Sequence, residues 1–154
     1  MADYEKQKKS NLKYDEALEA TLRILLVDDY PQIRESISNV LVAEGHEVIE
    51  AVNTEDALEK ISNAHTFDVI ISDYNMPPGK NGSEIYFQLK KRGLRIPFIL
   101  FSGNILGIPK EEFNKMDELY AFLDKPNGIA ALVSYIQDIQ IEKTEKSGFF
   151  HGDK

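Results

Sequence analysis

The chain has 154 residues, a formal net charge of −8, no cysteine and three scattered histidines. Its length suits one compact domain with a hydrophobic core, and the missing cysteines exclude disulfides, thiol catalysis and thiolate metal sites. The acidic balance argues against a direct nucleic-acid surface, because phosphate binding needs clustered Lys and Arg.

Residues 1–21 form a highly charged N-terminal extension. We expect it to be partly helical, because Tyr14, Leu18 and Leu22 follow one another at a spacing of four. It could dimerise, cover a functional face of the domain, or remain solvated. It lacks the apolar block of a secretory signal, and no apolar run in the chain reaches the roughly 18 residues of a membrane span. We therefore expect a soluble, cytoplasmic protein that does not contact a membrane.

From residue 22 onward, predicted strands alternate with predicted helices. Short apolar runs predict strands at residues 23–29, 46–52, 67–73, 96–102 and 120–124. Helical spacing predicts helices at 31–44, from a cap at Asn53 or Thr54, at 83–92, at 109–118 and from a cap at Asn127.

This alternation predicts an α/β fold with a mostly parallel, doubly wound sheet and helices on both faces. The near-continuous apolar strands fit such burial. We place the domain at residues 22–141, and we expect the polar tail, residues 142–154, to fray.

Reactive side chains follow four of the five predicted strands. In open parallel sheets, functional groups collect outside the carboxyl ends of the strands. The first strand ends in Asp28 and Asp29, the third in Asp73 and the fourth in Ser102, and Lys125 follows the fifth. The sequence therefore predicts three carboxylates, a hydroxyl and an ammonium at one edge of the sheet.

Each of these residues also has an ordinary structural interpretation. Asp29 could cap the next helix, Asp73 could start an Asx-turn, and Lys125 could be a solvated surface lysine. These interpretations do not explain the set, because capping needs one Asp after the first strand and the opposite edge has no comparable density of acids.

Three neighbouring carboxylates repel one another unless a cation compensates them. All-oxygen ligands are typical of a Mg²⁺ site, which would place Asp73 at the metal and leave Lys125 and Ser102 facing an anion. Such a site suits phosphoryl transfer, in which a carboxylate can act as the nucleophile and form an aspartyl phosphate.

Four motifs in this order, "LLVDD" (25–29), "DVIISDYNMP" (68–77), "LFSG" (100–103) and "FLDKP" (122–126), resemble a two-component response-regulator receiver domain. The resemblance covers about residues 22–141. It is similar to the stand-alone, chemotaxis-regulator (CheY-like) type, because 154 residues leave no room for an output domain. It implies a flavodoxin-like, five-stranded parallel sheet in the order 2-1-3-4-5.

The resemblance also implies roles for the acids. Asp73 would be the phosphoacceptor. Asp28 and Asp29 would form the acidic pair, with Asp29 as a direct Mg²⁺ ligand and Asp28 acting partly through water. The main-chain carbonyl of Asn75 would be a further Mg²⁺ ligand.

The same resemblance implies a conformational switch. Lys125 would pair with the phosphoryl group, and its bond to Pro126 would be cis. Ser102 would be the switch hydroxyl and Phe122 the switch aromatic, although Phe122 could also be an ordinary packed strand residue. On phosphorylation Ser102 would move inward and Phe122 would turn in behind it, remodelling the face made by the fourth helix, fifth strand and last helix of the domain.

As a family member the chain would be a regulatory phosphoacceptor and not an enzyme in the usual sense. Its phosphodonor would be a histidine kinase or a histidine phosphotransfer protein, and a downstream target protein would bind the remodelled face. It could instead relay the phosphoryl group onward. Two departures from the family pattern are a loop "NMPPGKNG" that is one residue longer than the commonest form and "ELYAF" without the usual glycine.

Three other classes of protein fit less well. A metal-dependent phosphatase would need a general acid two residues after the nucleophile, where this chain has Asn75. A flavodoxin-like electron carrier would need a hydroxyl- or glycine-rich loop after the first strand, and "DDYPQ" would repel a phosphate. A scaffold that is not phosphorylated would not need the complete set of acids, hydroxyl and lysine.

Overall fold

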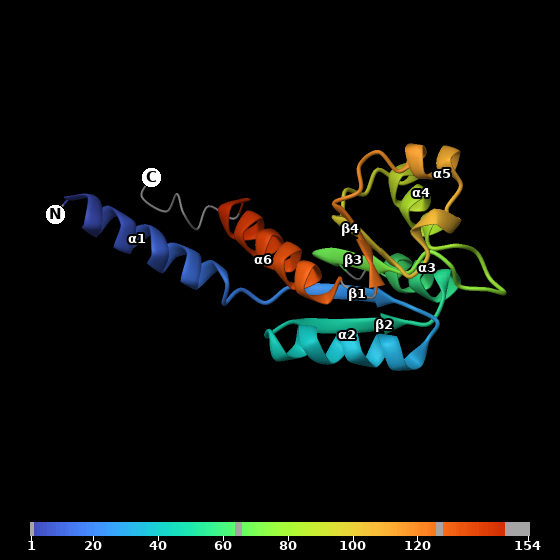
Figure 1. Cartoon of the computed structure of the whole chain (residues 1–154), viewed down its shortest axis with the longest axis horizontal. Helices are drawn as coiled ribbons and strands as arrows, with labels where there is room; N and C mark the ends of the chain where they lie inside the picture. Colours follow the sequence, from blue (N-terminus) through green and yellow to red (C-terminus); the bar gives the residue numbers. More distant parts are fainter. Residues whose placement is uncertain (1, 64–65, 126–127, 147–154) are drawn as a thin grey trace.

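The computed structural model describes residues 2–63, 66–125 and 128–146, and its strands form one parallel sheet in the order β2-β1-β3-β4-β5 (Figure 1). The strands are β1 (Arg23–Val27), β2 (Glu47–Ala51), β3 (Val69–Ser72), β4 (Phe98–Ser102) and β5 (Ala121–Asp124). The predicted doubly wound α/β fold and its strand order are confirmed.

The helices follow the local signals in the sequence. They are α1 (Ala2–Ala17), α2 (Pro31–Ala43), α3 (Thr54–Ser62), α4 (Ser83–Lys91), α5 (Lys110–Lys115) and α6 (Ile129–Lys146), with a 3₁₀ helix η1 (Ile105–Gly107). Pro31 occupies the first position of α2, where its missing N–H costs no hydrogen bond. Asn53 caps α3 by accepting the N–H of Asp56 at 2.7 Å, and Gly93 after α4 has the positive φ of 68° that ends a helix.

The sheet separates two hydrophobic cores, because successive side chains of a strand point to opposite faces. Leu25 and Val27 of β1 pack with α3 and α4 on one face. Ile24 and Leu26 pack with α2 and α6 on the other face. Both faces are thus covered, which explains the apolar strands.

The last two helices differ from the prediction. α5 is shorter than the predicted 109–118 and contains no buried residue. α6 is longer, and its final turns include residues 142–146, which we had expected to fray. The reason is tertiary contact, because Glu142 accepts a hydrogen bond from the Tyr120 hydroxyl at 2.9 Å and Thr144 is buried. The predicted cap Asn127 and the Lys125–Pro126 bond lie outside the described residues.

The N-terminal extension is helical, as predicted, but two of the three apolar residues that suggested the helix lie beyond its end. α1 ends at Ala17, and Figure 1 shows it extending away from the sheet at the end where β1 starts. Leu22 is not on this helix and is fully buried in the core beside Ile24. Leu18 and Leu22 thus both follow the last residue of α1, so the spacing that suggested a helix does not describe one face of it. Among the described helices, none is both long and apolar enough to cross a membrane.

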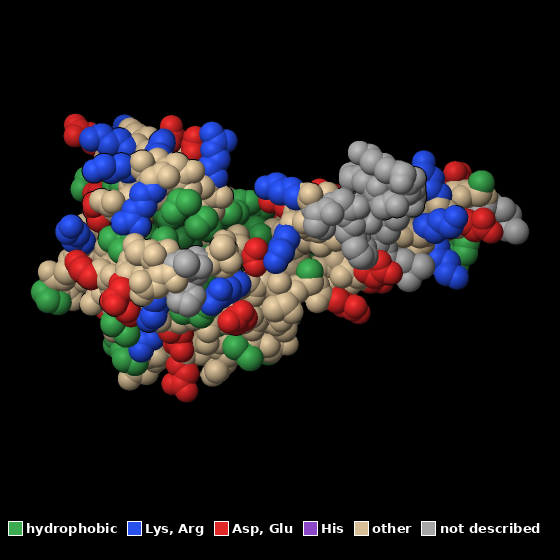
Figure 2. All heavy atoms as spheres, turned by 180° about the vertical axis from the view of Figure 1, so that it is seen from behind, with side chains coloured by type: hydrophobic (Ala, Val, Ile, Leu, Met, Phe, Trp, Pro, Cys, Tyr) green, Lys and Arg blue, Asp and Glu red, His purple; other side chains and the backbone are tan. Residues whose placement is uncertain are grey.

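Charges of both signs are mixed on the face of the molecule seen from behind (Figure 2). In the view from behind, Lys and Arg side chains alternate with Asp and Glu side chains over the domain and along the extension (Figure 2). Among the described residues, both signs of charge thus occur over the face shown in Figure 2.

Candidate functional site

β1 and β3 deliver two acids to the same point. Val27 pairs with Ser72 in the sheet register, so the next residues, Asp28 and Asp73, leave the sheet side by side. The N–H of Asp73 donates to the carbonyl of Val27 at 2.9 Å, which extends the ladder by one bond. Asp28 and Asp73 are 1% and 7% exposed, whereas Asp29 is exposed. One carboxylate oxygen from each of the three lies within 4.8 Å of the others, so the predicted acidic cluster is assembled.

Lys125, directly after β5, joins this cluster. Its Nζ atom lies 2.7 Å from Asp28 Oδ2 and 3.1 Å from Asp73 Oδ2, and its side chain is 14% exposed. The interpretation of Lys125 as a solvated surface lysine is therefore wrong. So is a capping role for Asp29, because the N-cap residue of α2 is Tyr30, with no side-chain cap.

The electrostatics of the site follow from burial and mutual repulsion. Burial raises the pKa of Asp73, the charge of Asp28 raises it further, and Lys125 opposes both. Burial alone would lower the pKa of Lys125, but the two carboxylates outweigh it and the net pKa is raised. The cluster thus combines three carboxylates with the ammonium of Lys125, which forms ion pairs with Asp28 and Asp73. A hard divalent cation such as Mg²⁺, which prefers oxygen ligands, fits this donor set and its excess of negative charge.

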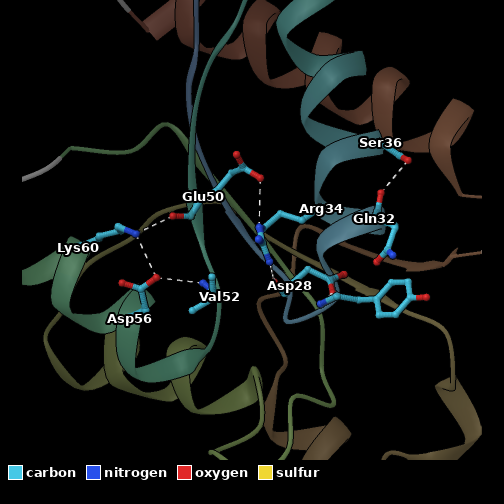
Figure 3. A network of polar contacts seen from close by, with 9 residues as sticks. Asp28, Gln32, Arg34, Ser36, Glu50, Val52, Asp56 and Lys60 are labelled. Atoms are coloured by element: carbon cyan, nitrogen blue, oxygen red, sulfur yellow. Dashed lines mark hydrogen bonds and ion pairs between the residues drawn. The ribbon is translucent and has the colours of Figure 1, made fainter.

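Contacts from α2, β2 and α3 hold the Asp28 loop, and they were not predicted from the sequence. Arg34 of α2 points at the loop, and its Nη1 atom donates to the main-chain oxygen of Asp28 at 2.8 Å (Figure 3). Its Nε atom lies 3.2 Å from Glu50 Oε1 on β2, and Lys60 of α3 donates to the Glu50 carbonyl at 2.7 Å. The available signal was an arginine one turn into the helix that follows the acids, with a glutamate on the neighbouring strand.

The loop after Asp73 is closed tightly at its base. The N–H of Tyr74 donates to Asp73 Oδ1 at 2.8 Å, and the N–H of Gly82 donates to the carbonyl of Tyr74 at 2.7 Å. A Cβ atom at Gly82 would collide with the main-chain oxygen of Asp73, so only glycine fits there. Asn75 is exposed in this loop. Its role as a carbonyl ligand of Mg²⁺ stays a prediction.

The two switch candidates lie on neighbouring strands. Ser102 ends β4, is 2% exposed, and its hydroxyl oxygen accepts the N–H of Asn104 at 3.3 Å. Phe122 of β5 is half-buried and packs edge to face on Phe113 of α5, with ring centroids 4.9 Å apart. Ser102 thus stands at the carboxyl end of β4 and Phe122 lies within β5, and their roles as switch residues stay predictions.

A pocket of about 420 Å³ lies away from the acidic cluster. Ile96 and Pro97, before β4, and Tyr120, before β5, contribute to its lining together with the end of α4 and Lys146 of α6. It therefore opens at the amino edge of the sheet, and the acids occupy the carboxyl edge.

Comparison with known proteins gives one consistent result. A family model described as a response regulator receiver domain matches residues 24–137. The gliding motility regulatory protein of Myxococcus xanthus is 37% identical over 98 residues, which cover 62% of this chain and 12% of that protein. The chain thus spans a small part of that relative's length.

Two solved structures are similar over nearly their whole length. Response regulator protein TrrA from Thermotoga maritima, in complex with Mg²⁺-BeF, is 28% identical with a TM-score of 0.68, and the match covers 77% of this chain and 98% of that one. Chemotaxis response regulator CheY4 of Vibrio cholerae is 29% identical with a TM-score of 0.66, and the match covers 78% and 99%.

Proposed function

This chain belongs to the response regulator receiver domain family, and we propose that it accepts a phosphoryl group on Asp73 from a histidine kinase or a histidine phosphotransfer protein. Phosphorylation then switches the binding of a downstream target protein in two-component signal transduction. The observation that carries the proposal is the position of Lys125, whose Nζ atom bridges the buried carboxylates of Asp28 and Asp73.

The transfer needs an ionised carboxylate that faces the donor. An oxygen of Asp73 attacks the phosphorus of a phosphohistidine, the P–N bond breaks, and the imidazole leaves with the electron pair and takes up a proton. Lys125 favours the ionised form of Asp73 before the transfer, and it pairs with a phosphoryl oxygen afterwards. The Ser102 hydroxyl donates to another phosphoryl oxygen.

Mg²⁺ would be held by Asp28, Asp29, Asp73 and the main-chain carbonyl of Asn75. When bound, it supplies positive charge to the phosphoryl oxygens. Asp28 is fixed for this role from two sides, because its Oδ1 atom accepts the N–H of Tyr30 at 2.9 Å and its main-chain oxygen is held by Arg34.

The direct test is intact-protein mass spectrometry after incubation with an acyl phosphate and Mg²⁺. We expect one added phosphoryl group in the wild type and none in Asp73→Asn. Asp117→Asn is the matched control, because Asp117 is an exposed acid whose ion pair is with Lys90 on the surface, and it should be phosphorylated like the wild type. Chelating Mg²⁺ should prevent the mass gain in the wild type and in Asp117→Asn.

Two outcomes would contradict the proposal. A mass gain in Asp73→Asn equal to that of the wild type would place the acceptor elsewhere. A folded wild type that gains mass neither from the acyl phosphate nor from a panel of phosphorylated histidine phosphotransfer proteins would also contradict it. That result would favour a scaffold protein that is not phosphorylated.

A further inference from the structure

One carboxylate joins the loop after Asp73 to α5. The Tyr74 hydroxyl donates to Glu112 Oε2 at 2.6 Å, and the Ser83 hydroxyl donates to Glu112 Oε1. Tyr74 begins the loop and Ser83 begins α4 at the other end of it. Glu112 therefore clamps both ends of the loop from a third element.

Tyr74 contacts the acceptor and the clamp at the same time. Its N–H binds Asp73 Oδ1 at 2.8 Å, and its hydroxyl binds Glu112 and also accepts the side-chain amide of Asn81 at 3.2 Å. Burial raises the pKa of Tyr74 to about 12, and the hydrogen bond to Glu112 contributes to this shift. The hydroxyl is thus a fixed proton donor to Glu112 at neutral pH.

The hydrogen bonds of Glu112 to Tyr74 and Ser83 attach α5, a helix that has few other buried contacts, to the acceptor loop. Tyr74 and Ser83 are 6% and 2% exposed, so both hydroxyls need a partner inside the protein. α5 has six residues and none of them is buried. The residue after Glu112, Phe113, packs on Phe122. Two adjacent residues therefore fasten α5, one to the acceptor loop and one to the candidate switch aromatic.

We propose that Glu112 is a positioning residue that transmits the state of Asp73 to α5 through Tyr74. This inference rests on the proposed phosphorylation of Asp73. When a phosphoryl group bonds to that carboxylate, the charge and the oxygen available to the Tyr74 N–H change. Tyr74 shifts, and α5 follows because Glu112 holds its hydroxyl. The connection runs beside the Ser102 and Phe122 switch and does not pass through either residue.

The test is NMR of the full chain with Mg²⁺ and beryllofluoride, an acyl-phosphate mimic. The readouts are the amide shift changes of residues 110–115 and the ¹⁹F shift change of fluorinated Phe122. We expect Tyr74→Phe and Glu112→Gln each to reduce the change in the α5 amides at least twofold and to leave the Phe122 change near that of the wild type. The double variant should show no further reduction, because both substitutions break one connection.

Glu111→Gln is the matched control, since Glu111 is the neighbouring, exposed acid on the same helix. It should respond like the wild type. If Glu112→Gln does not fold, Tyr74→Phe alone tests the connection, because it keeps the ring and removes one hydroxyl. A purely structural role for Glu112 would move the resting spectrum and leave the response to beryllofluoride intact.

The outcomes separate this inference from the proposed function. If beryllofluoride changes the signals around Asp73 and the α5 amides respond fully in both single variants, this inference is overturned and the proposed function stands. If beryllofluoride leaves the signals around Asp73 unchanged in the wild type, the proposed function is overturned and the inference fails with it.

Discussion

The buried Gln140 at the amino edge of the sheet binds main-chain groups, whereas the buried carboxylates of Asp28 and Asp73 at the carboxyl edge share one lysine. At the amino edge Gln140, 2% exposed, donates to the carbonyls of Leu18 and Ala20 at 2.9 and 2.8 Å. At the carboxyl edge the carboxylates of Asp28 and Asp73 share the ammonium of Lys125. One edge is arranged for stability, and the other keeps a reactive group at some cost to stability.

The amino edge also explains why the long α6 is ordered. Lys143 of α6 donates to Asp68 at 3.1 Å, and the same carboxylate oxygen accepts the N–H of Arg23 at 2.7 Å. The hydrogen bonds of Gln140 fasten α6 to the segment between α1 and β1, and the Asp68 carboxylate links Lys143 to the first residue of β1. The extension is thereby anchored at its C-terminal end, although most of α1 is exposed.

The largest effect on stability should come from Gln140→Ala at the amino edge. This substitution removes two part-buried hydrogen bonds, to the carbonyls of Leu18 and Ala20, and each such bond contributes about 0.5 to 1.5 kcal/mol. We expect urea unfolding to show a loss of roughly 2 kcal/mol in the free energy of unfolding. Gln137→Ala is the control on the same helix, since Gln137 is half-buried. Equal losses in the two variants would contradict the comparison.

A smaller effect of opposite sign should follow from Asp73→Asn at the carboxyl edge. The raised pKa of Asp73 means that its ionised form is disfavoured in the folded state. Replacing it should stabilise the protein by roughly 0.5 to 2 kcal/mol at neutral pH without Mg²⁺.

The pH dependence gives this prediction a second check. A raised folded-state pKa costs stability as the pH rises through it, so the advantage of Asp73→Asn should shrink as the pH falls toward the ordinary value of 3.8. Mg²⁺ should also shrink it by compensating the wild-type cluster. Urea unfolding at several pH values measures both trends, and an Asp73→Asn variant less stable than the wild type at neutral pH would refute the idea.

The smallest effect should come from His46 at the amino edge. His46 Nδ1 accepts the N–H of Leu22 at 3.1 Å, and burial lowers its pKa although Glu44 and Asp68 oppose the shift. The unfolded chain therefore binds a proton first as the pH falls below about 6.5, and stability declines until the folded-state pKa is reached. The slope should stay below the roughly 1.4 kcal/mol per pH unit that one full proton gives.

A substitution isolates this contribution. His46→Gln keeps an oxygen acceptor for the Leu22 N–H but does not titrate, so its stability should vary less with pH between about 7 and 5. Identical slopes for the wild type and His46→Gln would show that His46 does not carry the pH dependence.

Several features of the site were predictable because they depend on neighbours in the sequence. Asp73 follows an uninterrupted apolar run and precedes a break, so its position at a strand end could be inferred from residues 69–79. The position of Lys125 just after β5 followed in the same way. Glu112 could not be inferred, because it binds residues of other elements and belongs to no motif that marks it. Arg34 was missed although its position one turn into the helix after the acids was a usable signal.

The sequence by itself determined where the strands end, which faces of the helices are apolar and which reactive residues stand at the carboxyl edge, since these follow from short-range periodicity and turn residues. Only the tertiary structure decided that Lys125 lies between Asp28 and Asp73, that Glu112 clamps both ends of the acceptor loop, and that α6 continues to Lys146. The physical reason is that these contacts join segments far apart in the chain, and their partners are set by how helices pack on the sheet.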